Sequence, residues 1–361
     1  MLSDRRVFRD DWLPRRLEHR EQPTEKLFSR LSSISRGYTD NDVLIHGPSG
    51  VGKTTLARHC LTRYQEEAAL NVAKIRCLGK TTGGILLRAL EQLPVDGDVH
   101  RALSIDERKQ RLRSLEGPAV LLLDEADDLH ETEVLQAVER APGVAAIVII
   151  HDLEEWLVRH EADQVGGEPW HSRNQIELTR YGVDELADIL EPRAQQGLPP
   201  QAWDRSTLER VADKAAGAAR RGIQTLRYAA VVAGEQEARE ISDRHIEIGR
   251  ERARDEIRKA NLNSLPYHHQ VLYALIQEAG AGGIDAGALH NRYDEVTDDV
   301  YTTDSHPISK RSRRNKLQKL RDYDLINRIG DGGGVRYVPL DPDLESPVDP
   351  LGDVGQGATP E

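Results

Sequence analysis

Cysteine, methionine and phenylalanine are scarce in this chain of 361 residues. It contains two cysteines, one methionine and two phenylalanines. With only Cys60 and Cys77, a fold held together by several disulfide bonds is excluded. No apolar run approaches the ~18 residues that a membrane-spanning helix needs, and the N-terminal "MLSDRRVFRDDW" lacks the apolar stretch of a signal peptide. These absences predict a cytoplasmic protein with no membrane partner.

Lysine is also scarce, whereas acidic residues are abundant. The chain has 61 acidic residues against 49 basic ones, a net charge of −12, and only ten of the basic residues are lysine. This composition predicts a protein from a salt-accumulating cell, where an acidic surface aids solubility. A GC-rich genome, which favours arginine codons, is the alternative. Either way, the net charge excludes a diffuse nucleic-acid binder, so any DNA-binding surface has to be local.

Strands and helices alternate in the first half of the chain. Apolar runs predict strands within residues 42–47, 71–77, 118–127 and 143–152, and helices are expected at 54–69, 83–93 and 131–140. This alternation is typical of a doubly wound α/β domain with a parallel sheet. From Val183 the pattern becomes helical, and it predicts helices near 183–197, 205–216, 220–237 and 242–260. We interpret these as a small α domain and a long connecting helix.

The C-terminal part predicts a compact winged helix-turn-helix. Its helices are expected near residues 267–279, 284–293 and 307–322, and two short strands, "LINRIG" and "VRYVPL", flank "DGGG". Residues 341–361 hold six acids and no base, with many Pro and Gly, so they are predicted to be a disordered tail. The predicted domains are 1–180, 181–262, 263–340 and the tail 341–361.

The stretch "GPSGVGKT", Gly47 to Thr54, fits the P-loop pattern between a predicted strand and a predicted helix. Its glycines let backbone N–H groups turn around phosphate oxygens at a helix N-terminus. Lys53 is expected to reach the β and γ phosphates, and the Thr54 hydroxyl to bind Mg²⁺. The predicted nucleotide-binding residues are Gly47, Ser49, Gly50, Val51, Gly52, Lys53, Thr54 and Thr55.

"AVLLLDEAD" supplies two acids at the end of a buried strand. Asp124 is expected to hold Mg²⁺ through water, and Glu125 to polarise the attacking water as general base. An ordinary pair of strand-end acids is the alternative. In "GAARRGIQTLR", Arg220 and Arg221 begin a helix after a Gly turn, and one of them, Arg220 in our interpretation, is expected to reach the γ-phosphate. This makes the module AAA+-like, although a solvated helix face remains the alternative for the arginines.

These motifs, in this order, resemble the archaeal origin-recognition and cell-division-control type DNA replication initiators over roughly residues 7–340. "VFRDDWLPRRLEHREQ" is similar to the entry motif of that family, and the P-loop and "LLLDEAD" follow at suitable spacing. "IELTRYGVDELADILEPRAQQGL" and "GAARRGIQTLRYAAVVA" are similar to its lid entry and second sensor. "YHHQVLYALIQEAGAGGIDAGALHNRY" and "LQKLRDYDLINRIGDGGG" are similar to its winged helix.

The resemblance implies an AAA+ P-loop core with a helical lid and a C-terminal winged helix. It implies ATP binding by the P-loop, by Tyr181 and Arg193 near the lid hinge, and by Arg220. It also implies ATP hydrolysis, recognition of double-stranded origin DNA, recruitment of the replicative helicase, and association with other initiator protomers on DNA. In that family, the AAA+ domain also contacts DNA through a short helical insertion. The insertion follows the strand motif that "LLLDEAD" resembles.

The chain departs from the family pattern at several places. His151 stands where the family usually has Asn, and Ala218 replaces the acid of Gly-Asp-Ala-Arg. An Asn amide both donates and accepts, whereas a neutral His does so only in one tautomer, so hydrolysis is expected to be slow. The segment from Asp124 to His151 is short, so the DNA-touching insertion is expected to be reduced. Arg159 and Arg173 are both candidates for the arginine that acts on a neighbouring protomer.

The segment "SHPISKRSRRNKLQKLRDYD", residues 305–324, has no acid from Ser305 to Arg321. As the recognition helix, it would turn Ile308, Leu317 and Leu320 to the core and its basic side chains to a DNA major groove. The predicted DNA-binding residues are Lys310, Arg311, Arg313, Arg314, Lys316 and, just past the Gly-rich tip, Arg336. Lys319 is expected on the same surface. The alternative is a solvated helix that pairs with the acidic body or tail.

Three functions remain open on the sequence alone. The first is an ATP-switched replication initiator that binds origin DNA. The second is a divergent paralogue that acts as an ATP-sensing transcription regulator or mobile-element protein, which His151 and the short segment favour. The third is a signalling or defence NTPase whose winged helix binds proteins, against which the concentrated basic helix counts. Helicase binding separates the first two.

Overall fold

The computed structural model describes the chain except for residues 38–41, 130–132, 162–173, 298–305, 331–333 and 350–361. It consists of two compact units, Met1–Ala253 and Arg254–Glu361, and each is described by itself below. The division falls inside helix α10 (Asp243–Ser264), the predicted connecting helix. No helix in the described part of the chain is both long and apolar enough to cross a bilayer.

A five-stranded parallel sheet forms the centre of the first unit, with the strand order β2-β3-β4-β1-β5. The strands are β1 (Val43–His46), β2 (Asn71–Arg76), β3 (Ala119–Asp124), β4 (Val144–Ile149) and β5 (Gln175–Glu177). The middle strands β3 and β4 are buried along almost their whole length. Parallel strands covered on both faces need apolar residues at every position, which is why "AVLLL" and "VAAIVI" are continuous apolar runs.

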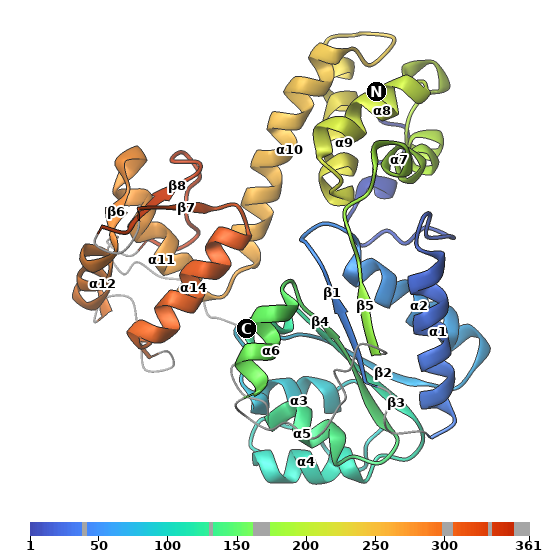
Figure 1. The fold of residues 1–361 in the computed structure, drawn as a ribbon, viewed down its shortest axis with the longest axis vertical. Helices are drawn as coiled ribbons and strands as arrows, with labels where there is room; N and C mark the ends of the chain where they lie inside the picture. Colours follow the sequence, from blue (N-terminus) through green and yellow to red (C-terminus); the bar gives the residue numbers. More distant parts are fainter. Residues whose placement is uncertain (38–41, 130–132, 162–173, 298–305, 331–333, 350–361) are drawn as a thin grey trace. The chain divides into compact units, whose positions relative to one another are not determined.

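Helices cover both faces of this sheet, as Figure 1 shows. Val120 and Leu122 of β3 pack with α1 and α2 on one face, and Leu121 and Leu123 pack with α3 to α6 on the other. The helices are α1 (Glu21–Ser35), α2 (Lys53–Glu67), α3 (Thr82–Leu90), α4 (Ile105–Arg113), α5 (Glu133–Glu139) and α6 (Leu153–Glu161). Sequence analysis missed α1, α4 and α6, although a Ser104–Glu107 capping box marks the start of α4. The doubly wound α/β prediction is confirmed.

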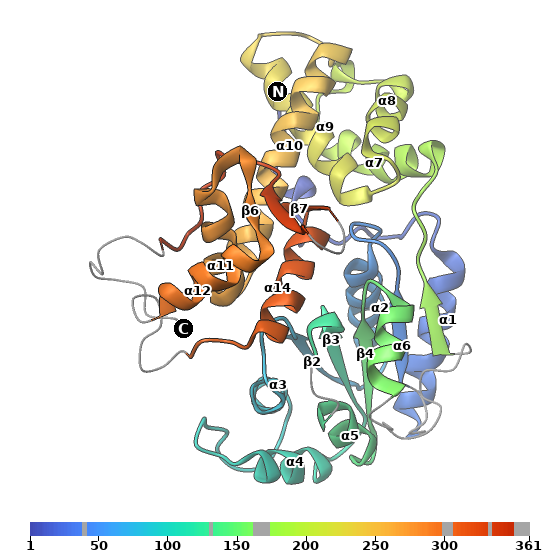
Figure 2. The ribbon, with the colours of Figure 1, turned by 60° about the vertical axis from the view of Figure 1, so that its left-hand side comes forward.

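Three further helices of the first unit form a separate cluster, visible from another side in Figure 2. They are α7 (Val183–Gly197), α8 (Arg205–Ala215) and α9 (Ala219–Glu235), and the start of α10 joins them. Leu186, Leu208 and Leu226 are buried between them. Each helix lies within two residues of its predicted bounds, because amphipathic spacing marks all three and the Asp204 side chain caps α8.

The N-terminus packs with this helical cluster. Val7 and Phe8, in the 3-10 turn η1 (Arg6–Phe8), are buried there, and the Gln224 side chain donates to the Phe8 carbonyl at 2.8 Å. A Cβ on Gly197 would lie 2.5 Å from the Phe8 ring, so only glycine permits this approach. The predicted first domain, 1–180, was therefore wrong for its first residues, because the apolar partners of Val7 and Phe8 lie in the cluster of α7, α8 and α9.

In its described residues, the second unit combines the end of α10 and the helices α11, α12 and α14 with a small antiparallel sheet of order β6-β8-β7. Its elements are α11 (Tyr267–Glu278), β6 (Ile284–Asp285), α12 (Ala286–Glu295), α14 (Lys310–Asp322), β7 (Ile326–Ile329) and β8 (Arg336–Pro339). This is the winged-helix arrangement that the sequence predicts, with β6 as an additional strand. Helix α14 begins three residues later than expected, because the Ser309 side chain caps it by accepting from the Ser312 N–H.

The disordered-tail prediction was wrong for residues 341–349. The Tyr273 hydroxyl donates to the carbonyls of Asp341 and Leu344, at 3.1 and 3.2 Å. The Ser346 hydroxyl donates to the Gln270 carbonyl at 3.1 Å. Low hydrophobicity predicted disorder here, but side chains of α11 hold the backbone of this segment through hydrogen bonds. Residues 350–361 lie outside the described part of the chain.

Candidate functional site

The P-loop connects β1 to α2. Gly47 has φ +139°, and a Cβ there would lie 2.1 Å from the Leu178 carbonyl oxygen, so the turn requires glycine. Gly52, with φ +93°, precedes Lys53, the first residue of α2. The first backbone N–H groups of a helix have no partner inside it. The loop therefore leads into a helix N-terminus, which favours phosphate.

Lys53, Thr54 and Asp124 lie together at the end of this loop. The buried Lys53 ammonium donates to the carbonyls of Gly47 and Pro48, at 2.6 and 2.8 Å. The Thr54 hydroxyl donates to the Asp124 carboxylate, 2.9 Å from Oδ2. Burial raises the pKa of the Asp124 carboxyl above its ordinary value. A hydroxyl and a carboxylate at this spacing are the hard oxygen ligands that Mg²⁺ prefers, so the two residues fit the predicted metal role.

Glu125 is held by an arginine that sequence analysis missed. The Arg76 guanidinium donates to both Glu125 carboxylate oxygens, at 2.8 and 3.1 Å. Arg76 ends β2 and pairs in register with Asp124 on β3, which brings it beside the next residue. Glu125 has φ +54°, an unusual backbone conformation outside glycine. Only the strand register places this arginine there, and no motif marks it.

Replacing Arg76 with alanine is expected to raise the rate of ATP hydrolysis by up to about fivefold. An ion pair this exposed is worth up to about 1 kcal/mol, and that free energy must be supplied when Glu125 leaves the arginine to activate water. Steady-state phosphate release would measure the change. Lys74→Ala, on the same strand, is the control. A rate that falls in Arg76→Ala would mean that the arginine assists the chemistry.

His151 follows β4, which lies between β3 and the P-loop strand β1. Its backbone N–H donates to Asp127 Oδ1 at 2.8 Å, and its ring Nδ1 lies 2.7 Å from Asp127 Oδ2. Asp127 belongs to the 3-10 turn η2 (Ala126–Asp128), directly after Glu125. The fold therefore brings His151 to the strand edge that carries Asp124 and Glu125.

The lid contacts the P-loop through the first turn of α9. The Arg220 backbone N–H donates to the Gly50 carbonyl at 3.3 Å, and a Cβ on Gly50 would lie 3.4 Å from Ala218. The Arg220 guanidinium forms a 2.9 Å ion pair with Asp10. The structure thus brings Arg220 to the P-loop by its backbone, while its side chain pairs with the N-terminal segment. Its role toward the γ-phosphate stays a prediction.

Tyr181 and Arg193 each stack with a residue of the N-terminal segment. The Arg20 guanidinium lies 3.7 Å from the centre of the Tyr181 ring and donates to the Thr179 carbonyl at 2.8 Å. The Arg193 guanidinium lies 4.4 Å from the centre of the Trp12 ring, and burial lowers the pKa of Arg193 to about 10. The motif "DDWLPRRLEHRE" contains both partners, Trp12 and Arg20, but sequence analysis gave them no individual role.

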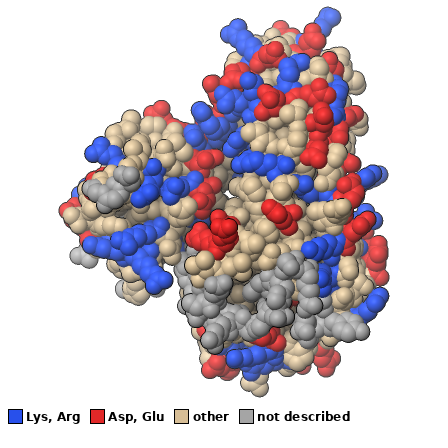
Figure 3. All heavy atoms as spheres, viewed as in Figure 1, with Lys and Arg blue, Asp and Glu red and all other residues tan. Residues whose placement is uncertain are grey.

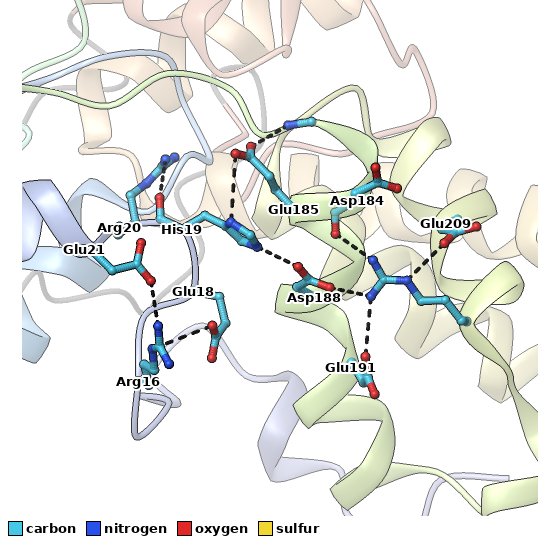
Figure 4. A network of polar contacts seen from close by, with 12 residues as sticks. Arg16, Glu18, His19, Arg20, Glu21, Asp184, Glu185, Asp188, Glu191 and Glu209 are labelled. Carbon is cyan, nitrogen blue, oxygen red and sulfur yellow. Dashed lines mark hydrogen bonds and ion pairs between the residues drawn. The ribbon is translucent and has the colours of Figure 1, made fainter.

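His19 links the same segment to the lid, as Figure 4 shows. Its Nε2 lies 2.7 Å from Asp188 of α7, and its Nδ1 lies 4.0 Å from Glu185. Arg205 of α8 donates to Asp188 at 2.5 Å and to Glu209 at 3.0 Å. The N-terminal motif is thus tied to the P-loop side by Arg20 and to the lid by His19.

In the second unit, the predicted DNA-binding helix α14 divides into an exposed and a buried face. The side chains of Lys310, Arg311 and Arg314 are exposed. Figure 3 shows Lys and Arg side chains gathered over this helix, at the lower left. On the wing, Arg336 is exposed and donates to the Gly282 carbonyl at 3.2 Å. Arg328 of β7 is exposed too, and sequence analysis did not name it.

Arg313 is a structural residue, so its predicted place on the DNA-facing surface was wrong. It is 5% exposed, forms an ion pair with Asp294, and donates to the His290 carbonyl at 3.0 Å. Its guanidinium lies 4.0 Å from the centre of the Tyr293 ring. Arg313 precedes the core residues Leu317 and Leu320 by four and seven positions, which places all three on one helix face. That spacing was visible in the sequence.

Lys316 and Lys319 are also buried, at 7% and 5% exposure, which contradicts their predicted exposure. The Lys319 ammonium lies 5.0 Å from the centre of the Tyr323 ring. The side chain of Arg159, in α6, and the whole of Arg173 lie outside the described residues, so the arginine that acts in trans stays open. The roles of the remaining predicted P-loop residues, Ser49, Val51 and Thr55, also stay predictions.

Two protein families match this chain. Residues 36–167 match the AAA domain, and residues 187–251 match the Cdc6 AAA+ ATPase-type lid domain. The chain is 31% identical to ORC1-type DNA replication protein 9 of Halobacterium salinarum over 346 residues, which cover 94% of both chains. It is 30% identical to ORC1-type DNA replication protein 1 of the same organism over 319 residues, which cover 87% of this chain and 100% of that protein.

Solved structures show the same fold. The Aeropyrum pernix ORC1 protein, in complex with DNA, superposes with a TM-score of 0.70 at 23% identity, over 94% of this chain and 93% of that one. The Aeropyrum pernix ORC2 protein, in ADPNP–ADP complexes, gives 0.59 at 22% identity over 96% of both chains. This likeness shows the fold. The sequence identity of 31% and 30% over 94% and 87% of this chain shows that it belongs to the ORC1-type DNA replication proteins, and with the AAA domain match it is an AAA+ ATPase.

Proposed function

We propose that this protein is an ATP-switched replication initiator, which binds double-stranded origin DNA and recruits the replicative helicase. The observation that carries the DNA-binding part is the exposed face of α14. In a chain of net charge −12, Lys310, Arg311 and Arg314 are exposed together on one helix of a winged-helix unit. Arginines on such a helix read guanine O6 and N7 in a major groove. The Aeropyrum pernix ORC1 protein, which shares this fold and was solved in complex with DNA, adds support.

The exposed residues divide the work of recognition. Lys310, Arg311 and Arg314 would enter the major groove, while Arg328 and Arg336 of the wing would contact phosphates. If about four phosphates are neutralised, the slope of log affinity against log salt is roughly −3.6, so a tenfold rise in salt costs about 10³–10⁴ in affinity. In a salt-rich cytoplasm, phosphate contacts alone would be weak. Base readout, or several protomers side by side on the DNA, would then supply the missing affinity.

Each step of the nucleotide cycle has candidate residues in the P-loop or close to it in the first unit. The start of α2 and Lys53 would bind the phosphates, and Thr54 and Asp124 would hold Mg²⁺, which neutralises phosphate charge. Glu125, once released by Arg76, would activate the water. Tyr181, Arg193 and Arg220 would connect the nucleotide to the lid. Because the first turn of α9 contacts Gly50, a change at the P-loop would move the lid. Slow hydrolysis would reset the switch.

Chromatin immunoprecipitation of the tagged protein, beside a Lys53→Ala variant, tests this function. A few sharp peaks beside replication start zones, lost in the variant, are the expected result. Co-purification of the replicative helicase from crosslinked cells should accompany them. Peaks at promoters, unrelated to replication starts and without helicase, would overturn the proposal in favour of an ATP-sensing transcription regulator. A lack of peaks would overturn the assignment of α14 to DNA.

A further inference from the structure

The pair formed by Asp127 and His151 distinguishes this chain from the family pattern, which places Asn at the end of β4. Two contacts join the residues, from Asp127 Oδ1 to the His151 backbone N–H and from Asp127 Oδ2 to the ring Nδ1. The carboxylate therefore engages both the backbone and the ring of one residue. A backbone cap alone would need only the first contact.

The chemistry of the two groups fixes the tautomer of the ring. An ionised carboxylate only accepts hydrogen bonds, so at a distance of 2.7 Å the proton has to be on Nδ1. In the neutral ring, Nε2 then carries a lone pair and accepts a hydrogen bond. A carboxylate that orients an imidazole in this way is a recurring device in enzyme active sites.

The strand order gives Nε2 a direction. Asp127 follows β3, so Nδ1 is turned toward the β3 side of β4. The other neighbour of β4 is β1, and the Ile150 N–H donates to the Ile45 carbonyl at 3.0 Å, two residues before the P-loop begins. The two ring nitrogens point in different directions, so Nε2 is turned away from Asp127, and β4, which His151 follows, borders the strand that leads into the phosphate-binding loop.

We propose that Asp127 is a positioning residue for ATP hydrolysis, which holds the His151 ring so that Nε2 accepts a hydrogen bond from the attacking water. This inference rests on the proposed hydrolysis by Glu125, which remains the general base. His151 thereby replaces the amide oxygen of the usual Asn.

The charged surroundings of His151 come from several strand ends. Asp127 contacts the ring, Asp152 is next in the chain, and Asp124 and Glu125 follow the neighbouring β3. On the β1 side lie Lys53 of the P-loop and His46, the last residue of β1. A fall of kcat on loss of the Asp127 carboxylate, which depends on the presence of the His151 ring, is the signature of the proposal.

Single-turnover and steady-state hydrolysis at fixed pH test the proposal with wild type, the two single variants and the double variant of Asp127 and His151. Adding Asp127→Asn to His151→Asn should change kcat little, because an amide side chain has no ring tautomer to hold. Asp127→Asn is expected to lower kcat roughly tenfold with little change in KM, the scale on which a partner that orients an imidazole acts. Its Oδ1 still accepts from the His151 backbone N–H, so the cap is kept.

A second readout does not depend on activity. In ¹⁵N-histidine-labelled protein, the signal that disappears in His151→Asn is assigned to residue 151, and it should report the Nδ1–H tautomer in wild type. Asp127→Asn should shift it toward a mixture of tautomers. An unchanged tautomer in Asp127→Asn, or an equal fall of kcat on Asp127→Asn whether residue 151 is His or Asn, would overturn the inference. ATP affinity and DNA binding, measured on the same variants, would stay normal in that case, which separates this failure from failure of the proposed function.

Discussion

Glu125→Gln is expected to lower the rate of ATP hydrolysis by about 10²–10⁴, while ATP affinity stays within a few-fold of wild type. The amide has the shape of the carboxylate but cannot take a proton from water. Lys53 and the start of α2 are expected to bind the phosphates, and Thr54 is expected to hold Mg²⁺. The hydrogen bonds of Lys53 to the P-loop carbonyls and of Thr54 to Asp124 do not involve residue 125. Single-turnover hydrolysis of labelled ATP and a binding titration with a slowly hydrolysed analogue measure the two quantities separately.

Glu177→Gln is the matched control for this prediction. Glu177 ends β5, on the other side of β1 from β4, and it is exposed. The Glu177→Gln variant should hydrolyse ATP at the wild-type rate. Arg76→Ala, which breaks the same ion pair from the other partner, should move the rate in the opposite direction to Glu125→Gln. If Glu125→Gln hydrolyses ATP normally, the general base lies elsewhere, and Asp127 with His151 becomes the first place to look.

Arg311→Ala combined with Arg314→Ala is expected to weaken binding to origin DNA by roughly 10- to 100-fold at fixed salt. Both side chains are exposed on α14, so their loss should leave the fold of the second unit intact. If both contact phosphates, the slope of log affinity against log salt becomes shallower by about 1.8. If they read bases, the slope changes little and discrimination between origin and random DNA falls instead. Fluorescence anisotropy over a series of salt concentrations distinguishes these outcomes.

Arg239→Ala combined with Arg244→Ala controls for the change in net charge, because both residues are exposed in the first unit. Arg313→Ala controls for the helix itself. Loss of the Arg313 contacts with Asp294, His290 and Tyr293 is expected to destabilise the second unit by roughly 2–4 kcal/mol. Hydrogen exchange within α12 and α14 should then accelerate, whereas the Arg311→Ala and Arg314→Ala pair leaves it unchanged. If the variant with Arg239→Ala and Arg244→Ala binds DNA as weakly as the variant with Arg311→Ala and Arg314→Ala, the local DNA surface is refuted.

Local patterns were sufficient for most of the architecture of this chain. The runs "AVLLL" and "VAAIVI" are typical of buried parallel strands, and their alternating residues do face two separate cores. The backbone of the P-loop has positive φ angles at its glycines, and these angles favour glycine. The requirement therefore appears directly in the sequence motif. The membership in the ORC1-type family is visible for the same reason, because its motifs are continuous stretches of sequence.

Partnerships between distant residues were decided by the tertiary structure. The ion pair of Arg76 with Glu125 follows from the register of β2 on β3, and the contact of Asp127 with His151 follows from the neighbourhood of β3 and β4. Burial decided that Arg313 supports the fold while Arg311 and Arg314 face solvent. The sequence by itself determined which elements form and which residue types they carry, because propensity and periodicity act locally. Which charges meet was decided by packing, because the Coulomb interaction depends on distance in space and not along the chain.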